Sequence, residues 1–165
     1  MTVRPVVRLP HRVLKQRSEP IAYAEAGTLI EDLLDTMRAS PACVGLAAPQ
    51  IGVAQRVIVV DVSEHPKTTS CHGLVILVDP EIMERGEPAV GREGCMSVPD
   101  LTANVERAST ITVRGISPSG EKTLITTDGF EARAFQHEVD HLDGFLILDR
   151  VASLSTDVFK RRVYR

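Results

Sequence analysis

The sequence predicts an α+β protein, built mainly from antiparallel β-sheets packed around a C-terminal helix, with one further helix near the N-terminus. Two observations support this prediction. Apolar residues follow the spacing of an amphipathic helix in two segments, and β-branched runs of strand length cluster between those segments. Strands grouped apart from the helices are typical of α+β proteins. The 165 residues suit a single domain, 1–165, long enough to bury a core.

The first helix is predicted over 28–40, "TLIEDLLDTMRAS", where leucines and a methionine recur at helical spacing. Thr28 and Glu31 have the spacing of a capping box at its start, and Pro41 would end it. The next segment, 43–52, reads "CVGLAAPQIG". Its small residues and proline predict an irregular, close-packed segment rather than a regular element.

Four segments in the middle of the chain have the composition of strands. The β-branched runs 55–62 and 74–82 are separated by a polar loop, 63–73. The segment 110–116, "TITVRGI", alternates apolar and polar residues, and "SPSG" then turns the chain into 121–129. The last two segments are therefore expected to form a hairpin.

A second helix is predicted from about Phe130 to Leu142, with Gly144 placed to end it. Phe135 and Val139 would lie on its apolar stripe together with Leu142. Tryptophan is absent and aromatic residues make up only 4% of the chain, so the core is expected to be aliphatic.

Composition restricts the class of protein. The formal net charge is -3, so overall charge gives no indication of DNA or an anionic membrane as a partner. No apolar stretch approaches the roughly 20 residues of a membrane span, and no N-terminal run resembles a signal peptide. The three cysteines, an odd number, argue against a disulfide framework. We therefore expect a cytoplasmic protein with free thiols, and the lack of a transit-like segment favours a bacterial over an organellar origin.

The segment "AFQHEVDHLDG" carries the clearest chemical pattern. His137 and His141 lie four residues apart, so on a helix their side chains point the same way and can bind one metal ion. Glu138 would then lie beside an open position of that ion, where a carboxylate can act as a base. The alternative is a surface helix with two solvated histidines, which the helical context and the terminating glycine disfavour.

A catalytic site of this kind usually has three protein ligands. Neither histidine nor glutamate occurs after His141, and the downstream Asp143 and Asp149 are better explained as capping or surface groups. The third ligand is therefore expected upstream. The best candidate is Cys95, which leads into a Ser-Val-Pro turn and whose thiolate would join two imidazoles. A buried structural cysteine is the alternative interpretation, and the Cys71–His72 pair is a rival ligand.

Three segments resemble, in order and spacing, the signature motifs of peptide deformylases: "CVGLAAPQ" (43–50), "EGCMS" (93–97) and "QHEVDHLDG" (136–144). The usual forms are GxGLAAxQ, EGCLS and QHExDHLxG. The likeness covers almost the whole chain, to about Val151. The resemblance implies a hydrolase that removes the formyl group from the N-formylmethionine of newly made proteins, with nascent N-formylmethionyl polypeptides as its partners.

The resemblance also implies site residues and a cofactor. One divalent metal ion per chain is implied, Fe²⁺ in the cell, with Zn²⁺, Ni²⁺ or Co²⁺ able to occupy the site. The implied residues are Cys95, His137 and His141 as metal ligands, Glu138 as base and then acid, Gln50 and the Met96 backbone N–H as donors to the formyl oxygen, and Val44, Gly45 and Gly94 as substrate contacts. Glu93 and Arg107 match a charged pair that supports the metal loop in relatives. Taken alone, Gln50 would be interpreted as a capping amide.

Two residues depart from the family pattern. Cys43 replaces the first glycine of the first motif, and its Cβ is expected to crowd the backbone or restrict a dihedral angle. Met96 replaces leucine, but the implied contact is its backbone N–H. The alternative function is therefore a deformylase-like metallohydrolase with altered acyl preference or reduced activity. A non-catalytic metal-binding module would leave Glu138 and Gln50 unexplained, and a metalloendopeptidase would lack its downstream ligand.

The chain ends in a basic segment, 159–165, "FKRRVYR". Most charge runs of this kind are solvated surface. The alternative is a weak contact with ribosomal RNA close to the emerging substrate.

Overall fold

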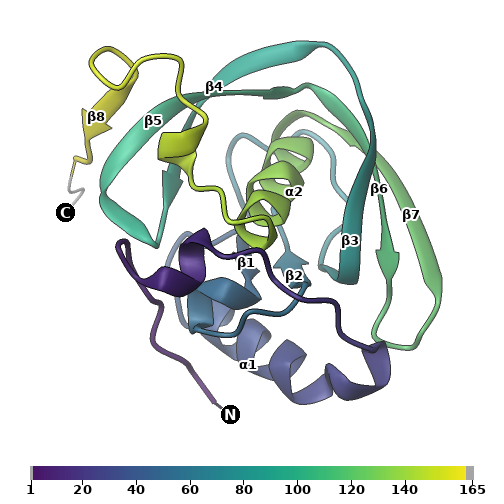
Figure 1. The fold of residues 1–165 in the computed structure, drawn as a ribbon. Helices are drawn as coiled ribbons and strands as arrows, with labels where there is room; N and C mark the ends of the chain where they lie inside the picture. Colours follow the sequence, from purple (N-terminus) through teal and green to yellow (C-terminus); the bar gives the residue numbers. More distant parts are fainter. Residues whose placement is uncertain (1, 163–165) are drawn as a thin grey trace.

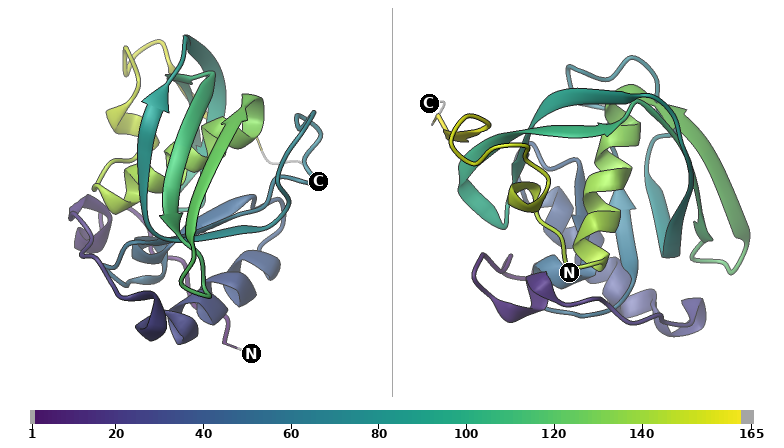
Figure 2. Two further views of the ribbon diagram at one scale, coloured as in Figure 1. Left: turned by 90° about the vertical axis from the view of Figure 1, so that its right-hand side faces the viewer. Right: turned by 45° about the horizontal axis from the view of Figure 1, so that its top comes forward.

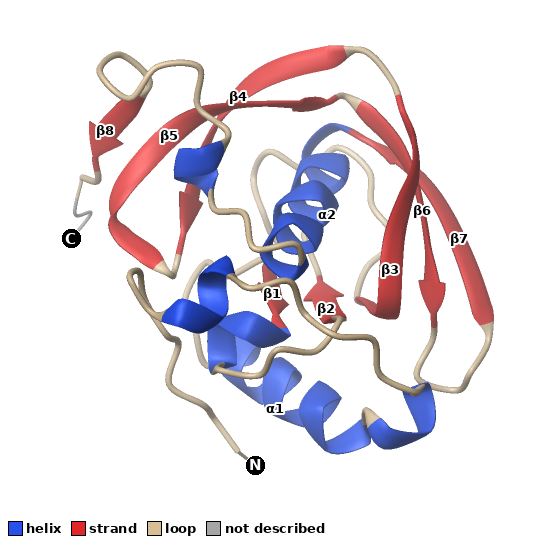
Figure 3. Ribbon diagram, viewed as in Figure 1, coloured by secondary structure: helices blue, strands red, loops and turns tan. Residues whose placement is uncertain are grey.

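Two antiparallel sheets make up most of the computed structural model, which describes residues 2–162 (Figures 1 and 3). The strands are β1 (Gly45–Ala47), β2 (Val57–Val60), β3 (Val75–Arg85), β4 (Pro88–Cys95), β5 (Val98–Ala108), β6 (Thr110–Ile116), β7 (Lys122–Asp128) and β8 (Val158–Lys160). The helices are α1 (Gly27–Arg38), α2 (Gly129–Leu142) and the short 3-10 helices Arg12–Lys15, Tyr23–Glu25, Ala48–Ile51 and Ile147–Asp149. One sheet has the order β1-β2-β3-β6-β7 and the other β4-β5-β8. The predicted fold class is confirmed.

Helix α2 lies between the two sheets, as the views in Figure 2 show. The predicted apolar stripe is buried: Phe135 and Leu142 are fully covered, and Val139 is 6% exposed. These side chains form one cluster with aliphatic residues of β2, β3 and β6. A second cluster joins α1 to β1 and β2, and a third lies under β4 and β5. The core is aliphatic, as expected from the composition.

Both predicted helices are present, but the expected capping box is wrong. Helix α1 begins at Gly27 with Ala26 at its N-cap, and no side chain caps it. The chain enters this helix directly from the 3-10 turn Tyr23–Glu25, so Thr28 already lies inside the first turn. Helix α2 matches its predicted bounds to within one residue, and Gly144 follows it with φ +83°, as expected for a helix-ending glycine.

The predicted strands are confirmed, and four further strands within residues 2–162 are additional to them. The run 74–82 continues to Arg85 as β3, past a register shift next to Asp79, which has φ +50°. The hairpin of β6 and β7 is in register from Thr110↔Asp128 to Ile116↔Lys122.

The strands that the sequence did not indicate are β1 and the sheet β4-β5-β8. The turn expected at Ser-Val-Pro instead lies at Met96–Ser97, and the chain from Val98 is already β5. The basic end of the chain is not a solvated tail throughout, because its first residues form β8, which pairs with β5. Residues 163–165 of that segment lie outside the described residues. Among residues 2–162, no helix combines the length and apolar character needed to cross a membrane.

The arrangement gives each sheet one outer strand next to α2. Strand β1 is the terminal strand of the five-stranded sheet, and β4 is the terminal strand of the three-stranded sheet. The residues Val44–Gly45 and Gly94, at the ends of these strands, line the same pocket. The fold therefore brings two free strand edges and the C-terminal helix to one place.

Phe135 tests how far the fold depends on the stripe of α2. The side chain is fully buried, so Phe135→Ala should lower the free energy of unfolding by about 3–5 kcal/mol through lost burial and a residual cavity. Denaturant titration measures this loss. The control is Leu124→Ala on β7, where the side chain is 69% exposed and a change within about 0.5 kcal/mol is expected. Equal effects of the two substitutions would contradict the assigned core.

Candidate metal centre

Helix α2 brings the two predicted histidines together. His137 and His141 lie one turn apart, and their Nε2 atoms are 3.3 Å from each other. The rings meet edge to face, with centroids 5.0 Å apart. His141 is almost fully buried, so the alternative of a surface helix with two solvated histidines does not describe this pair. Two ring nitrogens that face the same small space are suited to sharing a cation.

Cys95, the last residue of β4, completes the cluster. Its Sγ lies 3.4 Å from His141 Nε2, and the ligand atoms of the three side chains all lie within 4.8 Å of one another. No other group of histidine, cysteine and carboxylate side chains within residues 2–162 is arranged to hold an ion. A thiolate with two imidazoles fits a divalent transition metal. The rival His72 instead places its Nδ1 2.5 Å from Glu131, away from this cluster.

The thiol and the imidazoles of the cluster shift one another's pKa values. Burial alone would raise the pKa of the Cys95 thiol, but His141 and His137 outweigh burial and hold that pKa well below its usual range. Burial alone would lower the pKa of His137, but its bonds to Cys95 and Glu93 raise that pKa well above its usual range. The thiolate is therefore the favoured form of Cys95, and the thiolate is the form that binds metals.

The buried carboxylate of Glu93 contacts His137 on the side of the ring that faces away from the cluster. Glu93 Oε1 lies 2.9 Å from His137 Nδ1, which leaves Nε2 directed at the cluster. Arg107 donates to both oxygens of Glu93 at 3.0 Å, and Arg133 Nη1 donates to Oε2 at 2.8 Å. Burial would raise the pKa of Glu93, but His137 and Arg107 lower it far below its usual range. The predicted Glu93–Arg107 pair is present, and the structure extends it to Asp140, which Arg107 also contacts.

Glu138 occupies the position expected of a base. It is 4% exposed, and its Oε2 has no hydrogen-bond partner among residues 2–162. Burial raises its pKa, while His137 and His141 oppose that rise. A Cβ on Gly45 would lie 2.8 Å from Glu138 Oε1, so only glycine at this position lets β1 approach the carboxylate so closely.

Gln50 has the capping role considered from the sequence, and the other end of its amide faces the cluster. Its Oε1 accepts a hydrogen bond from the Ala47 N–H at 3.1 Å and so caps the 3-10 turn that follows β1. Its Nε2 donates to Ser97 Oγ at 3.3 Å and lies 3.7 Å from Cys95 Sγ. Capping therefore fixes the amide with its NH₂ group directed at the cluster. Ser97 is fully buried and was not identified from the sequence.

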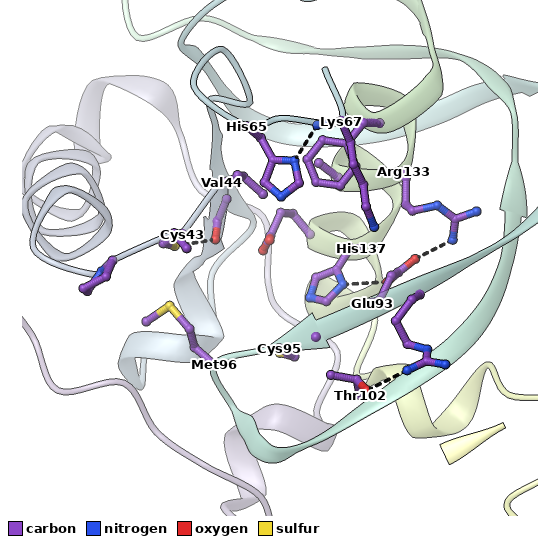
Figure 4. Close-up of a pocket in the computed structure, with 18 of the residues that line it drawn as sticks. Cys43, Val44, His65, Lys67, Glu93, Cys95, Met96, Thr102, Arg133 and His137 are labelled. Atoms are coloured by element: carbon purple, nitrogen blue, oxygen red, sulfur yellow. Dashed lines mark hydrogen bonds and ion pairs between the residues drawn. The ribbon is translucent and has the colours of Figure 1, made fainter. Parts of the chain in front are cut away.

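A pocket of about 750 Å³ opens onto the cluster (Figure 4). Its lining includes the expected residues Val44, Gly45, Gln50, Gly94, Cys95, Met96, His137 and Glu138. In Figure 4, Cys43 and Met96 lie to one side of Cys95 and His137, and Glu93, Arg133 and Thr102 lie to the other. The loop carrying His65 and Lys67 forms another part of the wall, where His65 stacks on Phe130 with centroids 4.2 Å apart.

The substituted Cys43 fits without the backbone strain expected from the sequence. The positive-φ residues outside glycine are Ala42 and Asp79, and Cys43 is not one of them in the described part of the chain. Its Sγ donates to the Gly45 carbonyl at 3.2 Å. Burial and, less strongly, the nearby Glu138 raise the pKa of the Cys43 thiol to about 12. Cys43 is therefore a protonated pocket-wall residue rather than a metal ligand.

Arg133 and Asp140 also belong to this site but were not identified from the sequence. Arg133 lies one helical turn before His137, and Asp140 lies one turn after it, so both share the general face of α2. That spacing was a usable signal. The spacing alone did not reveal their role, because Glu93, which binds Arg133 and His137, lies on β4, a strand that the sequence did not indicate.

Known proteins match this chain over nearly its full length. The sequence profile of the family described as "Polypeptide deformylase" matches residues 3–157. A peptide deformylase of Halothermothrix orenii is 40% identical over 160 residues, which are 96% of this chain and 99% of the relative. A peptide deformylase of Carboxydothermus hydrogenoformans is 42% identical over 156 residues, covering 93% of this chain and 97% of the relative.

Solved structures of peptide deformylases also match this chain over most of its length. A Met-Ala-Ser-bound class I type b peptide deformylase from Acinetobacter baumannii superposes with a TM-score of 0.85 at 36% identity, covering 91% of this chain and 99% of that one. A peptide deformylase from Thermotoga maritima gives a TM-score of 0.83 at 35% identity, covering 93% and 100%.

The bond between Glu93 and His137 can be tested through metal affinity. Glu93→Gln should weaken binding of Zn²⁺ or Co²⁺ by about 10–100-fold, because the imidazole loses the carboxylate that orients it. Competition with a chromophoric chelator measures the affinity. The matched control is Glu106→Gln, an exposed glutamate on the neighbouring strand β5, which should bind as the parent protein does. Unchanged affinity in Glu93→Gln would show that this contact does not support the site.

Proposed function

This chain belongs to the polypeptide deformylase family, and from that premise we propose that it hydrolyses the formyl group from N-formylmethionyl peptides in a metal-dependent reaction. Removal of this formyl group is the function of the family. The single observation that supports the proposal is the convergence of Cys95, His137 and His141 beside Glu138, at the base of a pocket between two free strand edges. The whole chain would act as one catalytic domain in the bacterial cytoplasm, on nascent polypeptides.

Cys95, His137 and His141 would hold one divalent ion. A thiolate and two imidazoles suit Fe²⁺, which we propose as the ion in the cell, and also Zn²⁺, Ni²⁺ and Co²⁺. When bound, a divalent ion supplies Lewis acidity, which would polarise the formyl group and lower the pKa of water at the site to about 7.

Glu138 would carry the proton through the reaction. Its buried carboxylate has one oxygen, Oε2, without a hydrogen-bond partner among residues 2–162, and the attacking water would be that partner. A raised pKa brings the carboxyl closer to neutral pH, where a group can both take a proton from water and return it to the leaving amine. Gly45 lets the carboxylate lie directly against β1, next to the expected path of the substrate.

The developing negative charge on the formyl oxygen would be stabilised by two donors. Gln50 Nε2 is one of them, and its bond to Ser97 holds it close to Cys95 before substrate arrives. The other is the backbone N–H of Met96, in the turn that follows the ligand Cys95. Donors that are already in place stabilise such charge without reorganising during the reaction.

The peptide itself would lie as an extended strand between β1 and β4. Val44 and Gly45 on one side and Gly94 on the other line the pocket, and β1 and β4 are terminal strands of their sheets. Main-chain hydrogen bonds to such edges do not depend on the substrate's side chains. This arrangement suits an enzyme that acts on many different proteins after their formylmethionine. The role of the chain's basic end at the ribosome stays a prediction.

Formate release from formyl-Met-Ala-Ser by anaerobically purified, Fe²⁺-loaded protein tests the proposal. Glu138→Gln should retain metal and lose nearly all turnover, because it cannot accept a proton. Gln50→Ala should lose roughly 10²–10³-fold in kcat, the usual cost of removing one such donor. Metal content measured on each variant is the control for an intact site. Near-normal turnover in metal-loaded Glu138→Gln would rule out Glu138 as the base.

The altered acyl preference considered for Cys43 has its own test. Because its thiol donates to the Gly45 carbonyl, the thiol is already engaged in the pocket wall. We expect a strong preference for formyl-Met-Ala-Ser over acetyl-Met-Ala-Ser both in the parent protein and in Cys43→Gly. Release of formate and acetate in a competition assay measures the preference. An acetyl activity that disappears in Cys43→Gly would establish the alternative function.

A further inference from the structure

The outer part of the pocket is strongly basic, although the whole chain carries a formal net charge of -3. The basic side chains that line it are Lys67, Arg92, Arg133, Arg161 and Arg162. Its acidic lining residues, Glu93 and Glu138, are both buried and belong to the metal centre. The surplus positive charge therefore faces the part of the pocket that would receive the peptide beyond its methionine.

These basic side chains differ in how many of their hydrogen bonds are already made within the protein. Arg133 is held by Glu93 and by the Val105 carbonyl, both at 2.8 Å. Arg92 donates to Asn104 Oδ1 at 2.9 Å and lies 3.7 Å above the Phe159 ring. For Arg161, by contrast, the Nε is buried and has no hydrogen-bond partner among the described residues. A buried guanidinium nitrogen without a partner is costly unless a ligand supplies one.

The pairing of strand β8 with β5 positions Arg161 at the pocket. Phe159 of β8 pairs with Thr102 of β5, which pairs in turn with Gly94 of β4. The Arg161 N–H then donates to the Asp100 carbonyl at 2.9 Å and extends the pairing by one residue. From there the side chain returns across β5 to Gly94.

The lack of a side chain at Gly94 leaves room for the Arg161 guanidinium. A Cβ on Gly94 would lie only 2.1 Å from Arg161 Nη2, so the guanidinium covers the surface that a side chain at this position would occupy. Gly94 is the residue immediately before the metal ligand Cys95, and it is one of the residues expected to contact the substrate. A peptide that lies along β4 advances by about 3.3 Å per residue, so its second and third residues come within reach of this guanidinium.

We propose that Arg161 determines substrate preference by binding an acidic side chain at the second or third residue of the formylated peptide. This inference rests on the proposed function, because it assumes that the peptide lies along β4. The guanidinium has the planar, forked donors that match a carboxylate. Nascent chains that begin formyl-Met-Ala-Asp would therefore be bound more tightly than neutral chains of the same shape.

Binding is measured in metal-loaded Glu138→Gln protein, so that the result does not depend on turnover. The probes are formyl-Met-Ala-Asp and formyl-Met-Ala-Asn, which have nearly the same shape and differ in charge. We expect the aspartate peptide to bind roughly two- to ten-fold more tightly, the range for a partly exposed charged pair. That preference should shrink as salt rises from about 0.1 to 1 M. Formate release from both peptides by the parent protein is followed in parallel.

The added substitution Arg161→Gln should bring the two affinities within error of each other, and Arg161→Lys should keep part of the preference. The matched control is Lys160→Gln, which removes an exposed charge from the adjacent β8 residue and should leave the preference intact. A preference that survives Arg161→Gln, or an equal loss of affinity for both peptides, would overturn the inference. If the metal-loaded parent protein releases no formate from either peptide while the binding preference is present, the proposed function alone would be overturned.

Discussion

The rest of the structure depends on the burial of the Glu93 carboxylate. This one group joins β4, which carries it, to β5 through Arg107 and to α2 through Arg133 and His137. A buried charge is tolerated only when its partners satisfy it, and Glu93 meets that condition with bonds to all three. Because the partners come from different elements, the bonds fix the angle between the second sheet and the helix. The position of the metal cluster follows from that angle, since Cys95 ends the strand that carries Glu93.

The parts of the fold that follow a local period could be predicted from the sequence. The stripe of α2 and the alternation of the β6–β7 hairpin specify their elements because one face of each is buried. Strand β4 has no such apolar signal, since its first three residues are exposed and its two buried residues are Glu93 and Cys95. Elimination could place the third ligand upstream, because no histidine or glutamate follows His141, but it left the Cys71–His72 pair open beside Cys95. Arg161 was not identified, because its position depends on the pairing of β8 with β5.

Several residues at this site combine a structural role with a position beside the cluster or the pocket. Gln50 caps a 3-10 turn with its oxygen, and that same bond aims its nitrogen at the cluster. Gly45 and Gly94 each leave space that a charged side chain fills, Glu138 in the first case and Arg161 in the second. A sequence pattern identifies small residues but not what occupies the space beside them. The observed cap is therefore compatible with the proposed donor role of Gln50.

The two free strand edges have a consequence for the protein when no substrate is bound. An exposed strand edge can pair with a strand of another molecule and so lead to aggregation. Here β1 is only three residues long, and the ends of β1 and β4 lie inside a pocket that the 63–73 loop borders. In the proposed function a single extended peptide would lie between these ends. We therefore expect the short length of β1 and the recessed position of these ends to limit pairing with a strand of another folded molecule.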